Sequence, residues 1–458
     1  MNPQHSHGQT IFAMIGLSLA LLAGNIVMAP VVYADIFPSG GKVASPDNKE
    51  QWISIGMGVR AEFAAQEKAA PSGDKYSNNF GIQNARVYMN GQLNRYLKFE
   101  FNTECFNCPS SINGGGGGNG SGGGATPASS NFFGGNSTVG LLDAIGKFEY
   151  NSYANLWVGR LLVPGERGEL NGPYFHAVFD GFRTPFNSAD FSGQMGKGGA
   201  GLYGRDNGAV FWGQVEPGYG HLQYSLGVFT GLQSSGSGCG GGPCGPNQKG
   251  SLLYAGRLTY NLWNAEKNPG YYTSGTYYGK SGDILALAAG FNHQANGAGS
   301  YQFSSDMTIL TGDFLLEKVL SDDMGVVTVN AEFKRYFADY DPRAFTSAGV
   351  SGVAGSFGNN FGMFRGSSYT AYALYLFPQT VGIGRFQPYG RYTYIAPDQS
   401  TIRSEWEGGL NYVIDGYNSR VSAFWQHGDI ASKGLTSFAQ HQAGDDVNRF
   451  VLAVQFQY

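Results

Sequence analysis

The chain has 458 residues, a formal net charge of −4 and a pI near 6.0, and only 14% of its residues are charged. This balance excludes a strongly basic nucleic-acid-binding surface, so we expect no nucleic-acid partner. No long apolar run follows the N-terminus, which excludes a bundle of membrane-spanning helices. A transmembrane β-barrel fits, because it carries apolar residues only at every second position.

The N-terminus has the pattern of an export signal. Residues 11–23 form one unbroken apolar stretch, and Val32-Tyr33-Ala34 precedes Asp35. Small residues at such a position are typical of a signal-peptidase site, although residues 1–10 contain no Lys or Arg. The alternative is an uncleaved anchor helix, for which the apolar run is short. We therefore expect a signal peptide at residues 1–34, a short periplasmic segment at residues 35–50 and one barrel domain at residues 51–458.

Apolar and polar residues alternate with a period of two from Gln51 onward. In residues 51–64, every second residue from Ile53 to Phe63 is apolar, whereas Arg60 and Glu62 lie at the positions between them. Successive strand residues point to opposite faces, so one face meets lipid and the other meets a lumen. The pattern predicts an all-β transmembrane antiparallel barrel of about sixteen strands. These strands are expected near 51–64, 80–93, 96–104, 139–150, 154–162, 204–215, 221–231, 251–263, 282–294, 306–319, 325–336, 368–377, 386–395, 404–414, 419–427 and 448–458.

The predicted connections alternate in length. Those after the second, fourth, sixth, tenth, twelfth and fourteenth strands are tight, and the others are mostly long. Short periplasmic turns and long external loops are typical of outer-membrane barrels. Two connections deviate: residues 264–281 are long on the short side, and residues 396–403 are short on the long side. A soluble β-sandwich is the alternative, but it has no reason to sort its loops by length.

The last predicted strand ends on an aromatic residue. Phe450, Leu452 and Val454 share one parity with Phe456 and Tyr458, and the sequence stops there. A closing strand of this kind resembles the assembly signal of outer-membrane β-barrels, so we assign that role to Phe456 and Tyr458.

All four cysteines fall in predicted external loops, namely Cys105, Cys108, Cys239 and Cys244. In an exported protein an even number of cysteines indicates disulfides. Their close spacing favours two local bridges, with a long-range bridge between the loops as the alternative. A zinc site with four cysteine ligands is a further alternative. Because Pro109 follows the Cys-x-x-Cys motif, covalent haem attachment is excluded, and we expect no cofactor and no metal.

Charged residues also occur at lumen-facing positions of the predicted strands. We expect the water of a channel to solvate them, because a Lys or Arg on the lipid face near mid-membrane would cost about 2–4 kcal/mol. The basic residues are Arg60, Arg86, Lys98, Arg257, Arg391 and Arg420, and the acidic ones are Glu62, Glu100, Asp143, Glu149, Asp313, Glu317 and Glu332.

Short motifs follow one another along nearly the whole mature chain. They are Asn84-Ala85-Arg86 through Lys98-Phe99-Glu100, Trp157-Val158-Gly159-Arg160 through Pro164, Gly204-Arg205-Asp206-Asn207-Gly208, Tyr224 to Gly231, Gln387 to Tyr392, and Gly409-Leu410-Asn411-Tyr412. Together they resemble the phosphate-selective porin O and P family of Gram-negative outer membranes. The resemblance implies a trimeric channel in the outer membrane through which small hydrophilic solutes or ions diffuse, with anions such as phosphate among the candidates.

The resemblance also implies that the third external loop, about residues 163–203, folds into the lumen and narrows it. Five charges of each sign in or beside this loop suggest a transverse field that orients solutes, with weak rather than strict anion preference. The alternative is that these charges are solvated or paired at the mouth. They are Arg160, Arg167, Arg183, Lys197 and Arg205, with Glu166, Glu169, Asp180, Asp190 and Asp206.

Two other function classes remain as alternatives. An outer-membrane enzyme would need a catalytic constellation around a histidine, and none of the histidines lies in a recognisable motif, so we expect no enzymatic activity. A barrel that encloses an electron-transfer cytochrome is the second alternative, since the haem would belong to that partner.

Overall fold

A computed structural model describes much of the chain, with gaps at the N-terminus and in several long connections. The signal-peptide prediction for residues 1–34 lies outside the described residues. No helix in the described part is long and apolar enough to cross a membrane. The described residues are 41–45, 48, 50–106, 138–181, 183–185, 204–232, 247–299, 304–321, 323–338, 365–398, 400–433 and 443–458.

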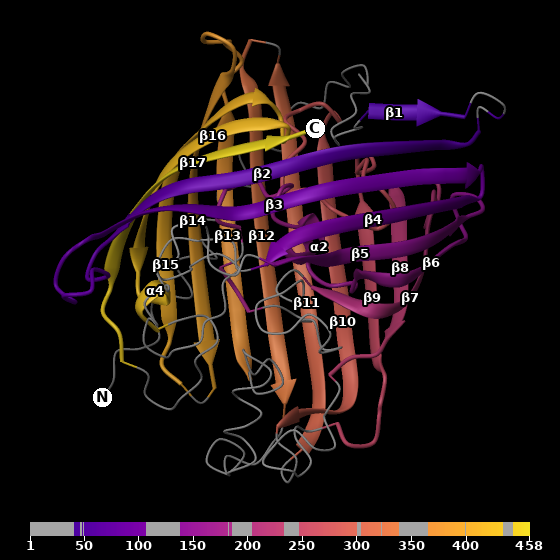
Figure 1. Ribbon diagram of the computed structural model, residues 1–458, viewed down its shortest axis with the longest axis horizontal. Coiled ribbons are helices and arrows are strands. Elements are labelled where there is room, and N and C mark those ends of the chain that lie inside the picture. Colours follow the sequence, from indigo (N-terminus) through magenta and orange to yellow (C-terminus); the bar gives the residue numbers. More distant parts are fainter. Residues whose placement is uncertain are drawn as a thin grey trace.

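Sixteen antiparallel strands close into a barrel (Figure 1). Each strand from β2 onward pairs with the next one in the chain, and β17 pairs with β2 to close the ring. Every predicted strand is confirmed. The alternation of short and long connections is confirmed too, except for the long connection at 262–283 and the short ones at 300–303 and 398–402. The strands are β2 (Trp52–Gln66), β3 (Ser77–Asn94), β4 (Leu97–Phe106), β5 (Thr138–Glu149), β6 (Asn155–Leu162), β7 (Arg205–Val215), β8 (His221–Phe229), β9 (Leu253–Asn261), β10 (Ile284–Gly299), β11 (Ser304–Ser321), β12 (Gly325–Ala338), β13 (Gly366–Leu376), β14 (Arg385–Pro397), β15 (Arg403–Asp415), β16 (Ser419–Gly428) and β17 (Val447–Gln457).

One further strand, β1 (Gly41–Ala44), was not predicted. It pairs with residues 52–55 of β2, beyond the point where β17 ends. Tyr458, the residue after β17, exchanges two backbone hydrogen bonds with Met57 of β2. β1 and β17 therefore follow one another along the same edge of β2.

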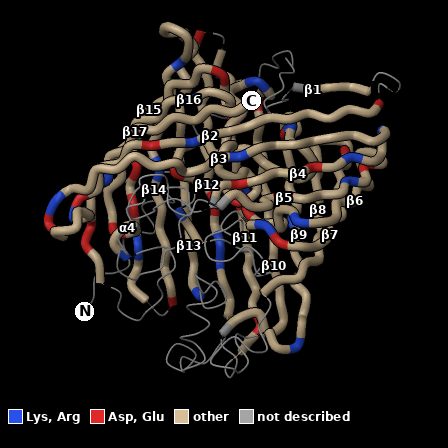
Figure 2. Tube along the Cα trace, in the orientation of Figure 1, with Lys and Arg blue, Asp and Glu red and all other residues tan. Residues whose placement is uncertain are grey.

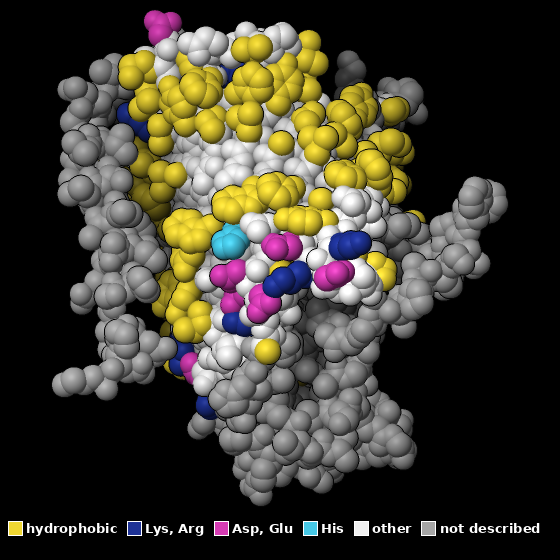
Figure 3. Space-filling model, turned by 90° about the vertical axis from the view of Figure 1, so that its left-hand side faces the viewer, with side chains coloured by type: hydrophobic (Ala, Val, Ile, Leu, Met, Phe, Trp, Pro, Cys, Tyr) yellow, Lys and Arg dark blue, Asp and Glu magenta, His cyan; other side chains and the backbone are white. Residues whose placement is uncertain are grey.

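The outer surface of the barrel is apolar. In β17, Phe450, Leu452 and Phe456 are about half exposed, whereas Val451 and Ala453 between them are buried. On the face shown in Figure 3, hydrophobic side chains gather in an upper and a lower belt with a paler band between them. Such belts are typical of a barrel surrounded by lipid. The predicted parity of the first and last strands is thus confirmed.

Candidate functional site in the barrel interior

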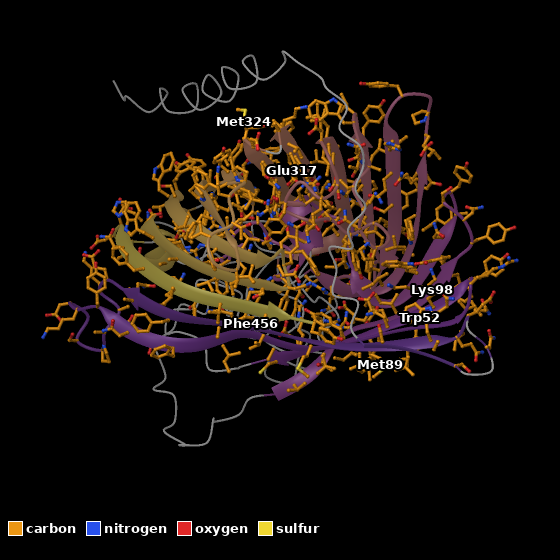
Figure 4. All side chains as sticks on the ribbon, turned by 90° about the horizontal axis from the view of Figure 1, so that it is seen from above. Trp52, Met89, Lys98, Glu317, Met324 and Phe456 are labelled. Atoms are coloured by element: carbon orange, nitrogen blue, oxygen red, sulfur yellow. The ribbon has the colours of Figure 1, made fainter. Side chains whose placement is uncertain are left out.

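Within the described part of the chain, two segments enter the barrel interior. The first, residues 163–185, follows β6 and contains helix α2 (Arg167–Asn171). The second, residues 262–283, joins β9 to β10. Tyr174 in the first and Tyr277 in the second have no exposed surface. Viewed from above, α2 lies within the ring of strands, with Glu317 on the inner side of the wall and Met89 on the outer side (Figure 4).

We call residues 163–185 the external segment and residues 262–283 the periplasmic segment. The sequence predicted that the third external loop folds inward, and its described part does so. The rest of that predicted loop, residues 186–203, lies outside the described residues. The sequence identified the connection at 264–281 only by its unusual length, and its inward course was not predicted.

Helix α2 begins at a buried acidic cap. The carboxylate of Glu166 accepts a hydrogen bond from the backbone N–H of Gly168, which satisfies one of the free amides of the first turn. Burial alone would raise the pKa of Glu166, but Lys334 lies 3.0 Å away and lowers it to about 2. The carboxylate therefore stays charged at physiological pH and ties α2 to the wall at β12.

Wall side chains bind the backbone of the external segment. Arg420 donates to the carbonyl oxygens of His176 (3.0 Å) and Ala177 (2.9 Å). Because these donors contact main-chain oxygens, they fix the course of the segment whatever its side chains are. The same kind of contact joins Arg60 to Phe179 O, Arg391 to Asp180 O, Arg257 to Gly165 O, Asn292 to Pro164 O, Asn411 to Ala177 O and Gln455 to Tyr174 O.

Arg167 joins the two inner segments. Its guanidinium makes a fork of two bonds to Glu266, at 2.5 and 2.8 Å, and lies 3.3 Å from Asp313. It also donates to the carbonyl oxygen of Ser274, while the hydroxyl of Thr273 donates to the carbonyl oxygen of Arg167. A planar guanidinium suits such a two-pronged contact with a carboxylate. Arg167 is thus bonded to the periplasmic segment and to the wall at once.

Other described charges of the interior are also paired. The carboxylate of Asp180 accepts a hydrogen bond from Arg449 and lies 3.6 Å from the guanidinium of Arg183. Arg183 also donates a hydrogen bond to Glu405. Burial alone would raise the pKa of Asp180, but the surrounding arginines hold it below its usual range. Further buried pairs are Arg86 with Glu104, Lys147 with Glu100, Arg205 with Asp143, Arg257 with Asp313, Arg391 with Glu407, Arg449 with Glu62, and Lys334 with Glu169.

The described candidates for pore lining all lie in the interior, but two expectations about them are wrong. We expected the lumen-facing charges to be solvated by channel water, whereas most of them are buried and bonded to other groups of the chain. Because the two inner segments occupy the interior, each buried charge needs a partner. Lys98 is different: it is 31% exposed and pairs with Glu149. Lys197 and Asp190 lie outside the described residues.

The charges also do not separate into a positive and a negative side. Arg167 and Arg183 were expected to face Glu166, Glu169 and Asp180 across a constriction. Arg183 instead contacts Asp180 directly, and Arg167 pairs with Glu266 of the other segment. Figure 2 likewise shows basic and acidic residues interspersed along the strands. The charges of the described residues therefore do not form a transverse field across an open constriction.

Arg160 lies in the interior against the parity of its own strand. Leu156 and Val158 of β6 point outward, and strict alternation would place Arg160 beside them. Gly159 has a φ of 137°, in a region that favours glycine, and alternation changes at this residue. Arg160, Leu161 and Leu162 are consequently all buried.

Several interior charges were not among the predicted site residues. They are Glu104, Lys147, Glu266, Lys334, Glu405, Glu407 and Arg449. Parity could have identified some of them: Lys334 shares a face with Glu332, and Arg449 shares a face with Gln455. Glu266 lies in a connection without strand periodicity, so no local pattern marks it.

Among the cysteines, only Cys105 is described. It is disulfide-bonded, and its partner lies outside the described residues. The prediction of two local bridges therefore remains a prediction for Cys108, Cys239 and Cys244. Within the described ranges no group of three or more His, Cys, Asp or Glu residues could hold a metal ion.

Comparison with known proteins gives structural similarity only. No protein-family model matches the chain, and no curated protein matches it. The anion-selective porin from Comamonas acidovorans is 12% identical, with 89% of this chain and 100% of that chain covered and a TM-score of 0.49. The outer membrane channel DcaP of Acinetobacter baumannii is 10% identical (91% and 99% covered, TM-score 0.46), and Salmonella typhi OmpF in complex with daunomycin is 10% identical (89% and 98% covered, TM-score 0.45). The assignment of a closed sixteen-stranded barrel rests on this chain's own strand pairing.

Proposed function

We propose that this protein is a channel of the bacterial outer membrane through which small hydrophilic solutes or ions diffuse passively. The observation that carries the proposal is the contrast between the two faces of the barrel wall. The outer face exposes apolar residues such as Leu452 and Phe456, and the inner face carries Arg60, Glu62 and many further charges. A wall that is apolar outside and polar inside suits a membrane pore.

The channel is gated in this proposal. Residues 163–185 and 262–283 occupy the interior, and their side chains and those of the wall are largely buried. Ions can then pass only when one of the two segments moves. The segments are joined to each other through Arg167 and Glu266, so their movements are coupled.

The finer assignments are part of the same proposal. The ordered motifs support a relationship to the phosphate-selective porin O and P family, and with it a homotrimer. The close pairing of opposite charges supports only weak anion preference, because paired charges leave little net field. Phe456 and Tyr458 remain our candidates for the assembly signal, and the signal peptide would direct export through the periplasm.

The decisive experiment is planar-bilayer recording of the purified protein with a salt gradient across the membrane. Stepwise conductance with a reversal potential near that of a weakly anion-preferring pore is the expected result. A protein that inserts without conducting ions overturns the channel proposal. Current that is blocked by low phosphate concentrations would show strict phosphate selectivity instead.

The same preparation tests the other function classes. A haem absorption band that copurifies in stoichiometric amount would favour a cytochrome sheath. A catalytic role for His176 is also disfavoured. Burial lowers the pKa of His176 to about 3, so the ring stays neutral, and a substrate cannot reach it.

A further inference from the structure

Among the buried polar atoms of the described interior that lack a hydrogen-bond partner, four gather on the neighbouring strands β12 and β13. Asn330 of β12 has no exposed surface, and neither its amide nitrogen nor its amide oxygen has a hydrogen-bond partner among the described residues. Tyr372 stands opposite Asn330 on β13 and is 4% exposed, and its hydroxyl is likewise unbonded. Glu332, two residues along β12, has one free carboxylate oxygen.

Further along the wall, donors such as Asn411 of β15 and Arg420 of β16 reach the carbonyl oxygens of the external segment and satisfy them. Buried polar groups in proteins nearly always have a partner, and each exception needs an explanation such as a ligand or an ion. Four unpaired polar atoms on two neighbouring strands therefore mark a place where a polar molecule binds.

The charges around Asn330, Glu332 and Tyr372 restrict the class of that molecule. The cations nearby are already engaged: Arg167 with Glu266, Lys334 with Glu166, and Arg391 with Glu407. Among the described residues, an anion would find no unpaired cation at this place. A hydroxyl group can both donate and accept, so it matches an amide, a phenol and a carboxylate oxygen together.

The external segment covers this place. A Cβ atom added at Gly168 of α2 would lie 2.7 Å from a carboxylate oxygen of Glu332 and 3.1 Å from one of Glu166. The unpaired atoms have no surface that water can reach. A solute can thus reach Asn330 only when α2 moves away from the wall.

We propose that Asn330, Tyr372 and Glu332 form a binding site for a neutral, polyhydroxylated solute, which becomes accessible when the external segment opens. The proposal rests on the channel function and names its solute class: a polyol or sugar rather than phosphate. Each hydroxyl of the solute replaces a hydrogen bond that is missing in the closed arrangement.

The test measures sorbitol permeation relative to chloride conductance in vesicles that contain the full-length protein. Asn330→Leu keeps the branched skeleton but replaces the amide oxygen and nitrogen by methyl groups, and Tyr372→Phe removes only the hydroxyl. Each substitution is expected to lower the sorbitol-to-chloride ratio about tenfold, which corresponds to about 1.4 kcal/mol. Tyr389→Phe is the matched control, because the Tyr389 hydroxyl on β14 is already bonded to Glu407 at 2.7 Å, and it should leave the ratio unchanged.

Equilibrium dialysis of radiolabelled sorbitol against the detergent-solubilised protein gives a second measurement that does not require conduction. Sorbitol binding that is lost in Asn330→Leu supports the site. A wild-type protein that conducts chloride but neither binds nor passes sorbitol overturns the site and leaves the channel intact. A protein without any ion conductance overturns the channel function, and a fall in phosphate permeation in place of sorbitol permeation would assign the site to an anion instead.

Discussion

The two segments inside the barrel are held by different kinds of contact. Charges dominate around the external segment, where Asp180, Arg183 and Glu166 make ion pairs with the wall. Aromatic rings dominate in the middle of the periplasmic segment. There, Tyr271 and Tyr272 pack against Trp157 with ring centroids 5.4 and 5.3 Å apart.

This difference predicts that the two segments respond differently to pH. Ion pairs depend on protonation, whereas aromatic packing and neutral hydrogen bonds do not. The hydroxyl of Tyr271 also donates to the carbonyl oxygen of Leu162 at 2.5 Å, a contact between neutral groups. We therefore expect pH to act mainly on the external segment, while the tyrosine-rich part of the periplasmic segment stays in place.

The largest effect is expected for Arg167→Ala, because Arg167 joins the two segments to each other. The substitution leaves Glu266 buried without its cation, and breaking such a pair costs about 3–5 kcal/mol. We expect a marked rise in the fraction of time that single channels spend open. Arg167→Lys retains the charge but not the two-pronged geometry. Its open fraction should lie between those of Arg167→Ala and the wild type. Unchanged single-channel records would show that Arg167 does not hold the two segments together.

This expectation differs from the one that the sequence alone supports. From the sequence, replacing Arg167 and Arg183 together by Ala should move the reversal potential towards cations without closing the pore. With both arginines paired inside the barrel, the main change should be in gating, and the shift in reversal potential should be secondary. Recording both quantities in the same variant separates the two interpretations.

The next largest effect is expected for Gly270→Ala in the periplasmic segment. Gly270 has a φ of 57°, and a Cβ atom there would lie 2.2 Å from the ring of Trp157. Overpacking of this kind costs about 1–3 kcal/mol. Hydrogen exchange should rise in residues 262–283 at every salt concentration.

Gly250→Ala is the matched control for this substitution. Gly250 also has a positive φ, 68°, but a Cβ atom there would meet nothing within 4 Å. It therefore reproduces the backbone strain without the collision. Equal exchange in the two variants would attribute the effect to strain rather than to the contact with Trp157.

A smaller effect is expected on acidification. Asp180 and Glu166 both have pKa values below their usual range, and that of Glu166 is about 2. A carboxyl group with a lowered pKa stabilises the folded arrangement above its unfolded pKa, and this stabilisation is lost as the pH falls towards the folded value. Between about pH 4.5 and 2, hydrogen exchange corrected for its intrinsic pH dependence should therefore rise in residues 174–181 before it rises in residues 270–273. The reverse order would contradict the contrast between the two segments.

The smallest effect is expected for Lys68→Ala at the external rim. The ammonium group lies 2.6 Å from Asp445, but the two side chains are 46% and 75% exposed. Solvent screens such a pair, so the thermal midpoint in detergent should not change measurably. A clear drop in that midpoint would show that this exposed pair contributes more than solvent screening allows.

The sequence predicted the wall of the barrel far better than its contents. Each strand is identified by its own alternation, a local pattern, so all sixteen could be predicted. The interior contacts join residues far apart in the chain, such as Arg183 and Glu405, which are 222 positions apart. Parity gives the face on which a charge lies but not its partner. For this reason the sequence predicted charges solvated by channel water, whereas the structure has mostly buried ion pairs.

The irregular parts show the same limit. Strand β1 is only four residues long, too short for alternation to be recognised. The periplasmic segment was notable only as an unusually long connection, which in retrospect was the signal for its inward course. Gly159 shows how one backbone angle can reverse the face of Arg160, and a side-chain pattern does not contain that angle.

The meeting of β17 and β1 on the edge of β2 suggests that the barrel is suited to circular permutation. Gln457 stands opposite Gly58 and Gly41 stands opposite Ile55, so Tyr458 at Met57 is separated from Gly41 by the single position opposite Gly56. Both strands run in the same direction there. One linking residue could join Tyr458 to Gly41 as a continuous strand, and new termini could then be opened in any of the tight turns of the barrel.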